Sequence, residues 1–191
     1  MLGAPGFDML PTFASLEPFY RWVSRSFKLG EAEEERAPMH EVETIDRIVM
    51  EAMKDHGGKE NLVGVLGFSQ GARISAGMLL RQQLEIRQRG SSDWKLKFGV
   101  VIGGPYPPIG LVPEDIELDY TVMSQLPSVH AWGRSDHLRS GCKEMADICD
   151  SSNTFVMDFE GGHHLPLTDH EADELCNLIV EAWHAGGGKE Q

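Results

Sequence analysis

The sequence predicts a single α/β domain, residues 1–191, built on a mostly parallel β-sheet with helices on both faces. Two observations support this fold class. From residue 41 onward, segments with helical periodicity alternate with short apolar runs, and such alternation favours a parallel sheet. The length of 191 residues also suffices for one domain with a substantial core but not comfortably for two.

Four segments have the pattern of helices. In the first, apolar residues such as Ile45 and Val49 recur at three- and four-residue steps, and the pair Gly57–Gly58 ends the pattern. Thr168 and Glu171 have capping-box spacing at the start of the last helix. The expected helices span residues 41–56, 70–89, 138–150 and 170–185.

Four apolar runs between these helices are typical of buried strands, at residues 62–68, 97–102, 128–132 and 154–159. Right-handed crossovers place the loops that follow parallel strands along one edge of the sheet, where α/β folds keep their sites. The long connection 103–126 contains four prolines. A loop of this length is either a flap that shapes the site or a mobile surface excursion.

Charge and composition narrow the partners. With 30 acidic against 17 basic residues, the net charge is −13. Such a surface repels phosphate backbones and anionic lipid, so we expect neither nucleic acid nor membrane as a partner. No apolar run approaches a transmembrane helix, and the first residues lack the basic start of a secretory signal. Three cysteines without CxxC spacing suggest a reducing, cytoplasmic setting.

The strongest motif is Gly67-Phe68-Ser69-Gln70-Gly71, which has the pattern G-x-S-x-G between an apolar run and a helical segment. In that context Ser69 is predicted to sit on a sharp turn with its hydroxyl above the sheet, where side chains two residues away would collide. The Gln70 amide, at a helix N-terminus, would be one oxyanion donor. The alternative is a tight turn in which Ser69 only caps the helix.

A serine nucleophile needs a base and an orienting acid, which follow it in the order Ser, Asp or Glu, His in this class. Asp136 follows the third predicted strand and His163 follows the fourth. We therefore expect His163 to take the proton of Ser69 and Asp136 to hold the imidazole. The alternative is that Asp136 only caps the next helix. His164 competes as base, but the two glycines before His163 favour a close approach by His163.

Other chemistries fit the sequence less well, and no cofactor is expected. A metal site could use His163, His164, Asp169 and His170, but adjacent histidines point apart and there is no HExxH motif. Cys142 and Cys149 lie seven residues apart, which is core spacing rather than that of a catalytic cysteine. His130 is interpreted as structural, and His137, His170 and His184 as surface or helix-end residues.

Together these motifs resemble the fungal serine hydrolase family, often called the FSH family. The resemblance rests on residues 67–72, 133–136 and 161–166, with residues 17–22 as a further likeness. It implies an α/β-hydrolase fold, esterase or thioesterase activity, and a triad of Ser69, Asp136 and His163. It also implies release or trimming of acyl chains in fungal secondary metabolism, with a polyketide synthase as a candidate partner. Acyl-protein thioesterases and related carboxylesterases share a similar elbow.

The chain departs from this family at its start. Members begin with a strand and an L-H-G-type loop that supplies the second oxyanion amide, and residues 1–19 contain no convincing equivalent. We expect an N-terminally shortened domain with about four strands and exposed sheet edges. Losing one oxyanion donor typically costs roughly 10²–10³ in rate. The sequence is then either a shortened gene model or a protein impaired or repurposed.

The leading hypothesis is a hydrolase of carboxylic esters or thioesters of a hydrophobic acyl chain, small or carrier-bound. Apolar residues of the long loop would line the acyl pocket, unless they merely pack on the sheet: Tyr106, Ile109, Leu111 and Val112. The alternative is a non-catalytic α/β-hydrolase-like binding protein that lacks a complete oxyanion hole. A phosphate-ester or phospholipid hydrolase is disfavoured by the acidic charge.

Overall fold

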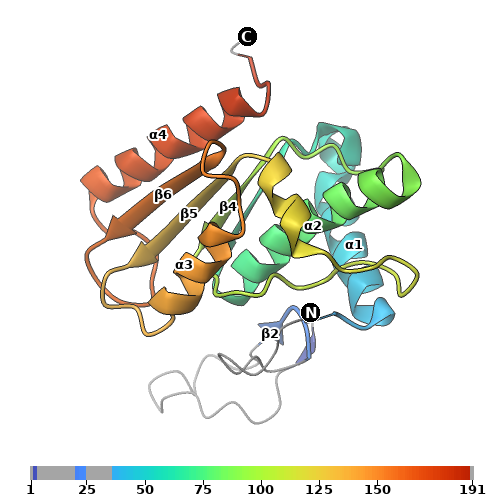
Figure 1. The fold of residues 1–191 in the computed structure, drawn as a ribbon, viewed down its shortest axis with the longest axis horizontal. Coiled ribbons are helices and arrows are strands. Elements are labelled where there is room, and N and C mark those ends of the chain that lie inside the picture. The colour runs from blue at the N-terminus through green and yellow to red at the C-terminus, as the bar shows by residue number, and fades with distance from the viewer. Residues whose placement is uncertain (1, 4–19, 25–35, 190–191) are drawn as a thin grey trace.

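A four-stranded parallel sheet forms the centre of the molecule (Figure 1). The computed structural model describes residues 2–3, 20–24 and 36–189. The strands lie in the order β3-β4-β5-β6, so neighbours in sequence are neighbours in the sheet. This arrangement confirms the predicted α/β class with a parallel sheet. The strand bounds are β3 Gly64–Phe68, β4 Phe98–Ile102, β5 Ser128–Gly133 and β6 Thr154–Phe159.

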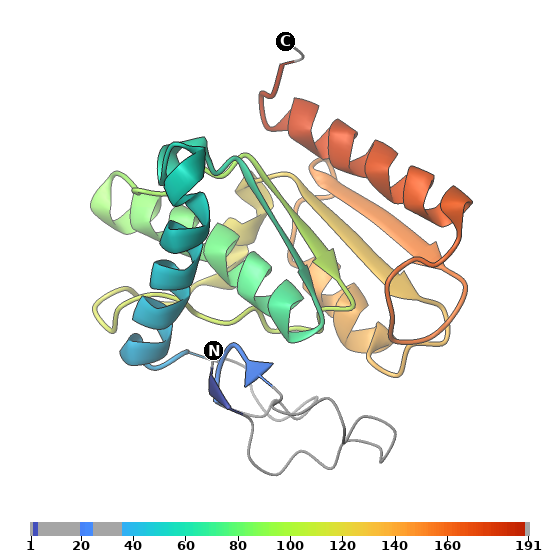
Figure 2. The same cartoon turned by 180° about the vertical axis from the view of Figure 1, so that it is seen from behind.

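Helices cover both faces of this sheet. α2 (Gln70–Arg89) and α3 (Arg139–Asp147) lie on one face, with α1 (Met39–Met53) beside α2, and α4 (Asp169–Ala185) lies on the other (Figures 1 and 2). The side chains of each strand alternate between these layers. On β4, for example, Val101 packs with the residues of α1 and α2, while Val100 and Ile102 pack with those of α4.

The predicted helices agree with the observed ones to within three residues at each end. α2 has the predicted bounds, and Thr168 and Glu171 form the predicted capping box at the start of α4. The third helix ends at Asp147 rather than at residue 150. The Asp150 carboxylate accepts hydrogen bonds from the amide and hydroxyl of Ser152, which favours a turn over another helical turn.

Several short elements were not predicted. β1 (Leu2–Gly3) pairs antiparallel with β2 (Tyr20–Arg21), and the described residues include three 3₁₀ segments that connect larger elements. The last of these, η4, lies within the long loop 103–126, where the Asp119 side chain accepts from the Thr121 amide and caps it. The others are η2 Lys54–His56 and η3 Lys59–Asn61. The run of acidic residues at 31–35, whose sequence is typical of a solvated loop, lies outside the described residues.

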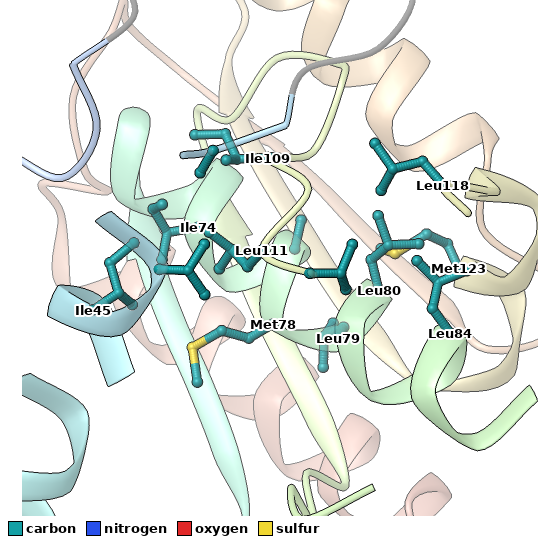
Figure 3. Packing of buried hydrophobic residues seen from close by; sticks show 14 of the residues in the cluster. Ile45, Ile74, Met78, Leu79, Leu80, Leu84, Ile109, Leu111, Leu118 and Met123 are labelled. Carbon is teal, nitrogen blue, oxygen red and sulfur yellow. The ribbon is translucent and has the colours of Figure 1, made fainter. Parts of the chain in front are cut away.

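The main core fills the space between α1, α2 and the long loop. Figure 3 shows Ile45 of α1 and Ile109 and Leu111 of the loop gathered around the side chains of α2. The loop approaches α2 so closely that a Cβ on Gly77 would lie 2.1 Å from the Ile109 carbonyl oxygen. The long loop is therefore part of the core along this stretch, rather than a surface excursion.

Among the described strands, β3 stands at one end of the sheet. In the described part of the chain it pairs with β4 alone, and 58% of Leu66 is exposed. A mainly apolar groove of about 520 Å³ runs beside this strand, between β3, α1 and α2. Within the described residues, one edge of β3 is thus unpaired, where the sequence predicted an exposed sheet edge. Within the described ranges, no helix has the length and apolar character needed to cross a bilayer.

Candidate active site

Ser69 occupies the strained turn between β3 and α2. Its φ of 55° is the one positive φ of a non-glycine residue among the described residues, and its ψ is −120°. Such backbone strain persists where the surroundings fix the conformation, and it clusters at functional sites. Here the Ser69 amide donates to the Ile102 carbonyl at 2.9 Å, which ties the turn to β4. The turn therefore holds the Ser69 side chain beyond the carboxyl end of β3.

The two glycines of the motif have different roles. A Cβ on Gly67 would lie 2.1 Å from the Gly71 carbonyl oxygen, so a side chain there would force the turn apart. A Cβ on Gly71 would meet only Trp22 Nε1 at 3.5 Å among the described atoms, which is an ordinary contact. The predicted collision is confirmed at Gly67. It is not found at Gly71, where the missing side chain instead leaves room beside Trp22.

Two hydrogen bonds join the three predicted residues. Ser69 Oγ lies 2.9 Å from His163 Nε2, and His163 Nδ1 lies 2.9 Å from Asp136 Oδ2. The residues come from loops after β3, β6 and β5, at the same end of the sheet, as the parallel topology requires. The Asp136 side chain is 1% exposed, whereas that of His163 is 22% exposed. The imidazole is thus accessible, and the carboxylate behind it is shielded.

Leu138 rather than Asp136 is the N-cap of α3, so Asp136 orients His163 and also fixes the turn before that helix. Its Oδ2 holds His163, while its Oδ1 accepts from the Leu138 amide at 2.8 Å just before α3. The loop that carries it is joined to the loop after β6, because the Ser135 amide donates to the Gly161 carbonyl at 2.8 Å. A Cβ on Gly133 would lie 2.4 Å from that same carbonyl oxygen. Glycine at this position therefore lets the acid and base loops pack together.

His163 is held on two sides besides its hydrogen bonds. The Phe68 ring lies 4.9 Å from the imidazole centroid, and the His137 ring lies 5.3 Å away in an edge-on arrangement. A Cβ on Gly103, which has a φ of +59°, would lie 3.1 Å from His163 Cε1. The loop after β4 thus needs a glycine next to the imidazole. Sequence reasoning placed His137 at the surface, and its contact with His163 was missed because ring packing leaves no spacing pattern.

His164 has a different environment. Its Nε2 accepts from the Gly162 amide at 3.1 Å, and its Nδ1 donates to the Leu165 carbonyl at 2.7 Å. Its ring also packs on Phe159, at 5.6 Å between centroids. Both ring nitrogens are therefore used within the loop. Of the two adjacent histidines, it is His163 that contacts Ser69.

The Gln70 amide lies at the N-terminus of α2, where the helix leaves backbone N–H groups free. Its role as an oxyanion donor remains a prediction. The stretch in which the sequence offers no second donor loop, residues 1–19, lies outside the described residues except for Leu2–Gly3. The Gln70 side chain, in contrast, is fully engaged, since it hydrogen-bonds the backbone of Trp22 and Val23.

The loop residues predicted to bind an acyl chain lie deeper than expected. Ile109 and Leu111 are 0% and 1% exposed in the core, and Val112 is equally buried. Tyr106 is half-buried and packs edge-on against Tyr120, with 5.6 Å between ring centroids. Packing of the loop accounts for these positions. The groove beside β3 is lined by other residues, so acyl binding by Tyr106, Ile109 and Leu111 stays a prediction.

The sequence also raised a metal site and a catalytic cysteine as alternative chemistries. Within the described ranges, no three His, Cys, Asp or Glu side chains are placed to hold a metal ion. Cys142 is buried, and burial together with the nearby Asp136 raises the pKa of its thiol to about 12. His130 is buried on β5, in keeping with its predicted structural role.

Comparison with known proteins agrees with the geometry. The family model described as Serine hydrolase (FSH1) matches residues 9–175. The chain belongs to this family of serine hydrolases. Esterase FUS5 of Gibberella moniliformis is 30% identical over 177 residues, covering 92% of this chain and 67% of the relative. Thioesterase FSL2 of Gibberella zeae is 26% identical over 198 residues, covering 94% and 75%.

Solved structures show the fold. Acyl-protein thioesterase 2 of Zea mays matches with a TM-score of 0.58 and 18% identity, over 84% of this chain and 71% of that protein. The Bacillus cereus carboxylesterase matches with a TM-score of 0.50 and 19% identity, over 75% of this chain and 60% of that one. The fold of this chain is therefore that of the α/β hydrolases, although it spans only part of their length.

Proposed function

We propose that this serine hydrolase cleaves carboxylic ester or thioester bonds through a covalent acyl intermediate on Ser69. The observation that carries the proposal is the continuous hydrogen-bonded path Ser69 Oγ–His163 Nε2 and His163 Nδ1–Asp136 Oδ2, each step 2.9 Å long. A free serine hydroxyl is a poor nucleophile, and an adjacent oriented imidazole is the usual means of activating it. The match to a serine hydrolase family supports the same assignment.

In the acylation step, Ser69 Oγ attacks the acyl carbonyl carbon while its proton passes to His163 Nε2. Asp136 keeps the imidazole in the required tautomer and stabilises the imidazolium. The Gln70 amide donates to the oxyanion of the tetrahedral intermediate. Collapse of this intermediate breaks the bond to the leaving alcohol or thiol, which takes the proton from His163, and the acyl group remains on Ser69.

In the second step, water attacks the acyl-serine carbonyl and gives a proton to His163. The tetrahedral intermediate then releases the carboxylic acid, and Ser69 Oγ recovers its proton from His163. Overall, one water molecule is consumed for each ester or thioester bond cleaved. These steps use the triad and the Gln70 backbone donor.

The substrate class we propose is a hydrophobic acyl chain, carried by a small molecule or by a carrier protein. Relatives named as esterases and as a thioesterase support both leaving groups. The likeness to fungal enzymes of secondary metabolism adds polyketide release or trimming, with a polyketide synthase as the partner. All three cysteines are free thiols, which supports our proposal of a cytoplasmic location.

A fluorophosphonate probe tests the assignment, because it reacts only with an activated serine. We expect one label per chain in the wild type and none in Ser69→Ala, together with loss of p-nitrophenyl ester and acyl-thioester turnover. Ser128→Ala is the matched control, since Ser128 also lies 3.0 Å from a histidine but is buried. It should label normally.

Absence of labelling in folded wild-type protein would contradict the proposal. Binding of acyl ligands that is unchanged in Ser69→Ala, without turnover, would instead favour the non-catalytic binding protein. Circular dichroism spectra of the variants would show that they are folded.

A further inference from the structure

Helix α2 uses glutamine side chains to hold passing backbone. The Leu96 amide donates to Gln82 Oε1 at 2.7 Å, and Gln82 Nε2 donates back to the Leu96 carbonyl at 3.0 Å. Gln88 holds the backbone of Glu117 in the same way, at 3.1 and 2.8 Å. Each carboxamide thus supplies one acceptor and one donor, as a neighbouring β-strand would.

Gln70 makes a third contact of this kind, at the opposite end of α2. Its Oε1 accepts from the Trp22 amide at 2.7 Å, and its Nε2 donates to the Val23 carbonyl at 3.3 Å. The residue held lies 48 positions earlier in the chain, and β2, which immediately precedes it, lies beside the N-terminal end of α2 in both ribbon views (Figures 1 and 2). Unlike the other two, this glutamine directly follows the Ser69 nucleophile.

The segment held by Gln70 is fastened a second time. The Ser24 amide donates to Glu41 Oε1 at 3.0 Å, and Glu41 is 1% exposed at the start of α1. Two polar side chains, one from α2 and one from α1, therefore hold the backbone of three consecutive residues, 22–24. Such fixing restricts where the Trp22 side chain can lie.

Trp22 lies against the nucleophile turn. Its Nε1 is 3.5 Å from the Cβ position of Gly71, two residues after Ser69. Together with Gly67, Phe68 and Gly71, it lines the end of the apolar groove next to that turn. Trp22 thus contributes an aromatic side chain to the groove beside the turn that carries Ser69.

We propose that Trp22 is a wall of the acyl-binding site and that the Gln70 side chain is the positioning residue that holds it there. The occupant is the hydrocarbon part of the acyl chain, because the groove lining is apolar apart from Ser75. This inference rests on the proposed hydrolysis at Ser69. It gives Gln70 two separate roles, with its amide facing the oxyanion and its carboxamide shaping the acyl site.

The test is acyl-chain selectivity, measured as the ratio of kcat/KM for p-nitrophenyl octanoate to that for the acetate. Trp22→Ala should lower this ratio about tenfold or more, since each methylene group in an apolar site contributes on the order of tenfold. Gln70→Met keeps the backbone amide but loses both hydrogen bonds, and it should lower the ratio in the same direction. Trp22→Phe should retain most of the selectivity.

Gln82→Met is the matched control. It removes the same pair of hydrogen bonds from the same helix, far from Ser69, and should leave the ratio within about twofold of the wild type, whatever it does to stability. Wild-type turnover with an unchanged ratio in both Trp22→Ala and Gln70→Met would overturn the inference while the hydrolase assignment stands. Absence of turnover of either ester by the wild type would overturn both.

Discussion

The molecule contains two histidine–serine pairs, and the contrast between them shows what activates a serine. At the carboxyl end of the sheet, His163 lies 2.9 Å from Ser69, with the Asp136 carboxylate on its other nitrogen. At the amino end of β5, His130 lies 3.0 Å from Ser128. The two distances are nearly equal, so hydrogen-bond geometry alone does not separate a candidate active site from a structural contact.

The difference lies in what surrounds each imidazole. His130 is 1% exposed, and in the described part of the chain no carboxylate contacts it. Burial lowers its pKa to about 4, so it is a poor proton acceptor at neutral pH. His163 is partly exposed and has a buried carboxylate to stabilise its protonated form. An imidazole that must accept a proton during a reaction needs both features.

Exchanging each histidine for glutamine separates catalysis from stability, and this is the largest effect we expect. His163→Gln should lower kcat by about 10³-fold or more because the general base is lost, with a small effect on unfolding. His130→Gln should leave kcat per folded molecule within about threefold but lower the free energy of unfolding by about 1–3 kcal/mol. Ester turnover and urea unfolding measure the two quantities. Equal losses of kcat in both variants would abolish the distinction.

Removing the charge of the Asp136 carboxylate makes the His163–Ser69 pair resemble the His130–Ser128 pair. Asp136→Asn keeps an oxygen for the Leu138 amide but lets the imidazole adopt the wrong tautomer, so kcat should fall by about 10³–10⁴ with KM little changed. Asp158→Asn is the control, because Asp158 is a partly exposed acid that pairs with Arg134 at the end of β6. Activity of Asp136→Asn within tenfold of the wild type would argue against an orienting acid.

The buried pair should reveal itself in the pH dependence of stability. The folded-state pKa of His130, about 4, lies below its unfolded value of about 6.5, so the unfolded chain takes up this proton first as the pH falls. Titration of His130 therefore leaves the free energy of unfolding unchanged above pH 6.5 and lowers it towards pH 4, by on the order of 3 kcal/mol in total. Urea unfolding across this range should be less steeply pH-dependent in His130→Gln. An unchanged slope would mean that other groups dominate the window.

The fold and the convergence of the candidate catalytic residues could be predicted from the sequence. The order of helices and strands follows from apolar periodicity, and parallel topology then places the ends of β3, β5 and β6 at one edge. Residues Ser69, Asp136 and His163, each just after a predicted strand, were therefore predicted to converge, and the structure brings them together. Local pattern was sufficient because Ser69 directly follows β3, and Asp136 and His163 lie in the short loops that follow β5 and β6.

The parts that escaped prediction depend on contacts between distant segments. The sequence left open whether Ile109 and Leu111 bind an acyl chain or only pack within the fold. Both are buried in the core beside α2, and no local pattern distinguishes the two outcomes. The hydrogen bond between Gln70 and Trp22 joins residues 48 positions apart. The sequence motif assigns a role to the backbone amide of Gln70 but none to its side chain. Such contacts require the assembled fold.

A smaller effect concerns Cys149, which lies next to His130 of the buried His130–Ser128 pair, so the two side chains resemble a cysteine–histidine site. Its Sγ lies 3.7 Å from His130 Nε2, yet burial raises the pKa of the thiol and lowers that of the imidazole. Both groups therefore stay neutral, and a neutral thiol is a weak nucleophile. We expect iodoacetamide at pH 7.5 to label Cys176, the one exposed cysteine, and to leave ester turnover within about twofold.

Cys176→Ser should then remove nearly all labelling of the folded protein, while urea exposes the two remaining thiols. Rapid modification of Cys149 in the native state would mean that its thiol proton has moved to His130, which leaves a thiolate–imidazolium ion pair. In that case burial would not be sufficient to keep the His130–Ser128 pair chemically inert. The labelling pattern, read by peptide mass, thus tests the same physical difference as the histidine variants, without altering either pair.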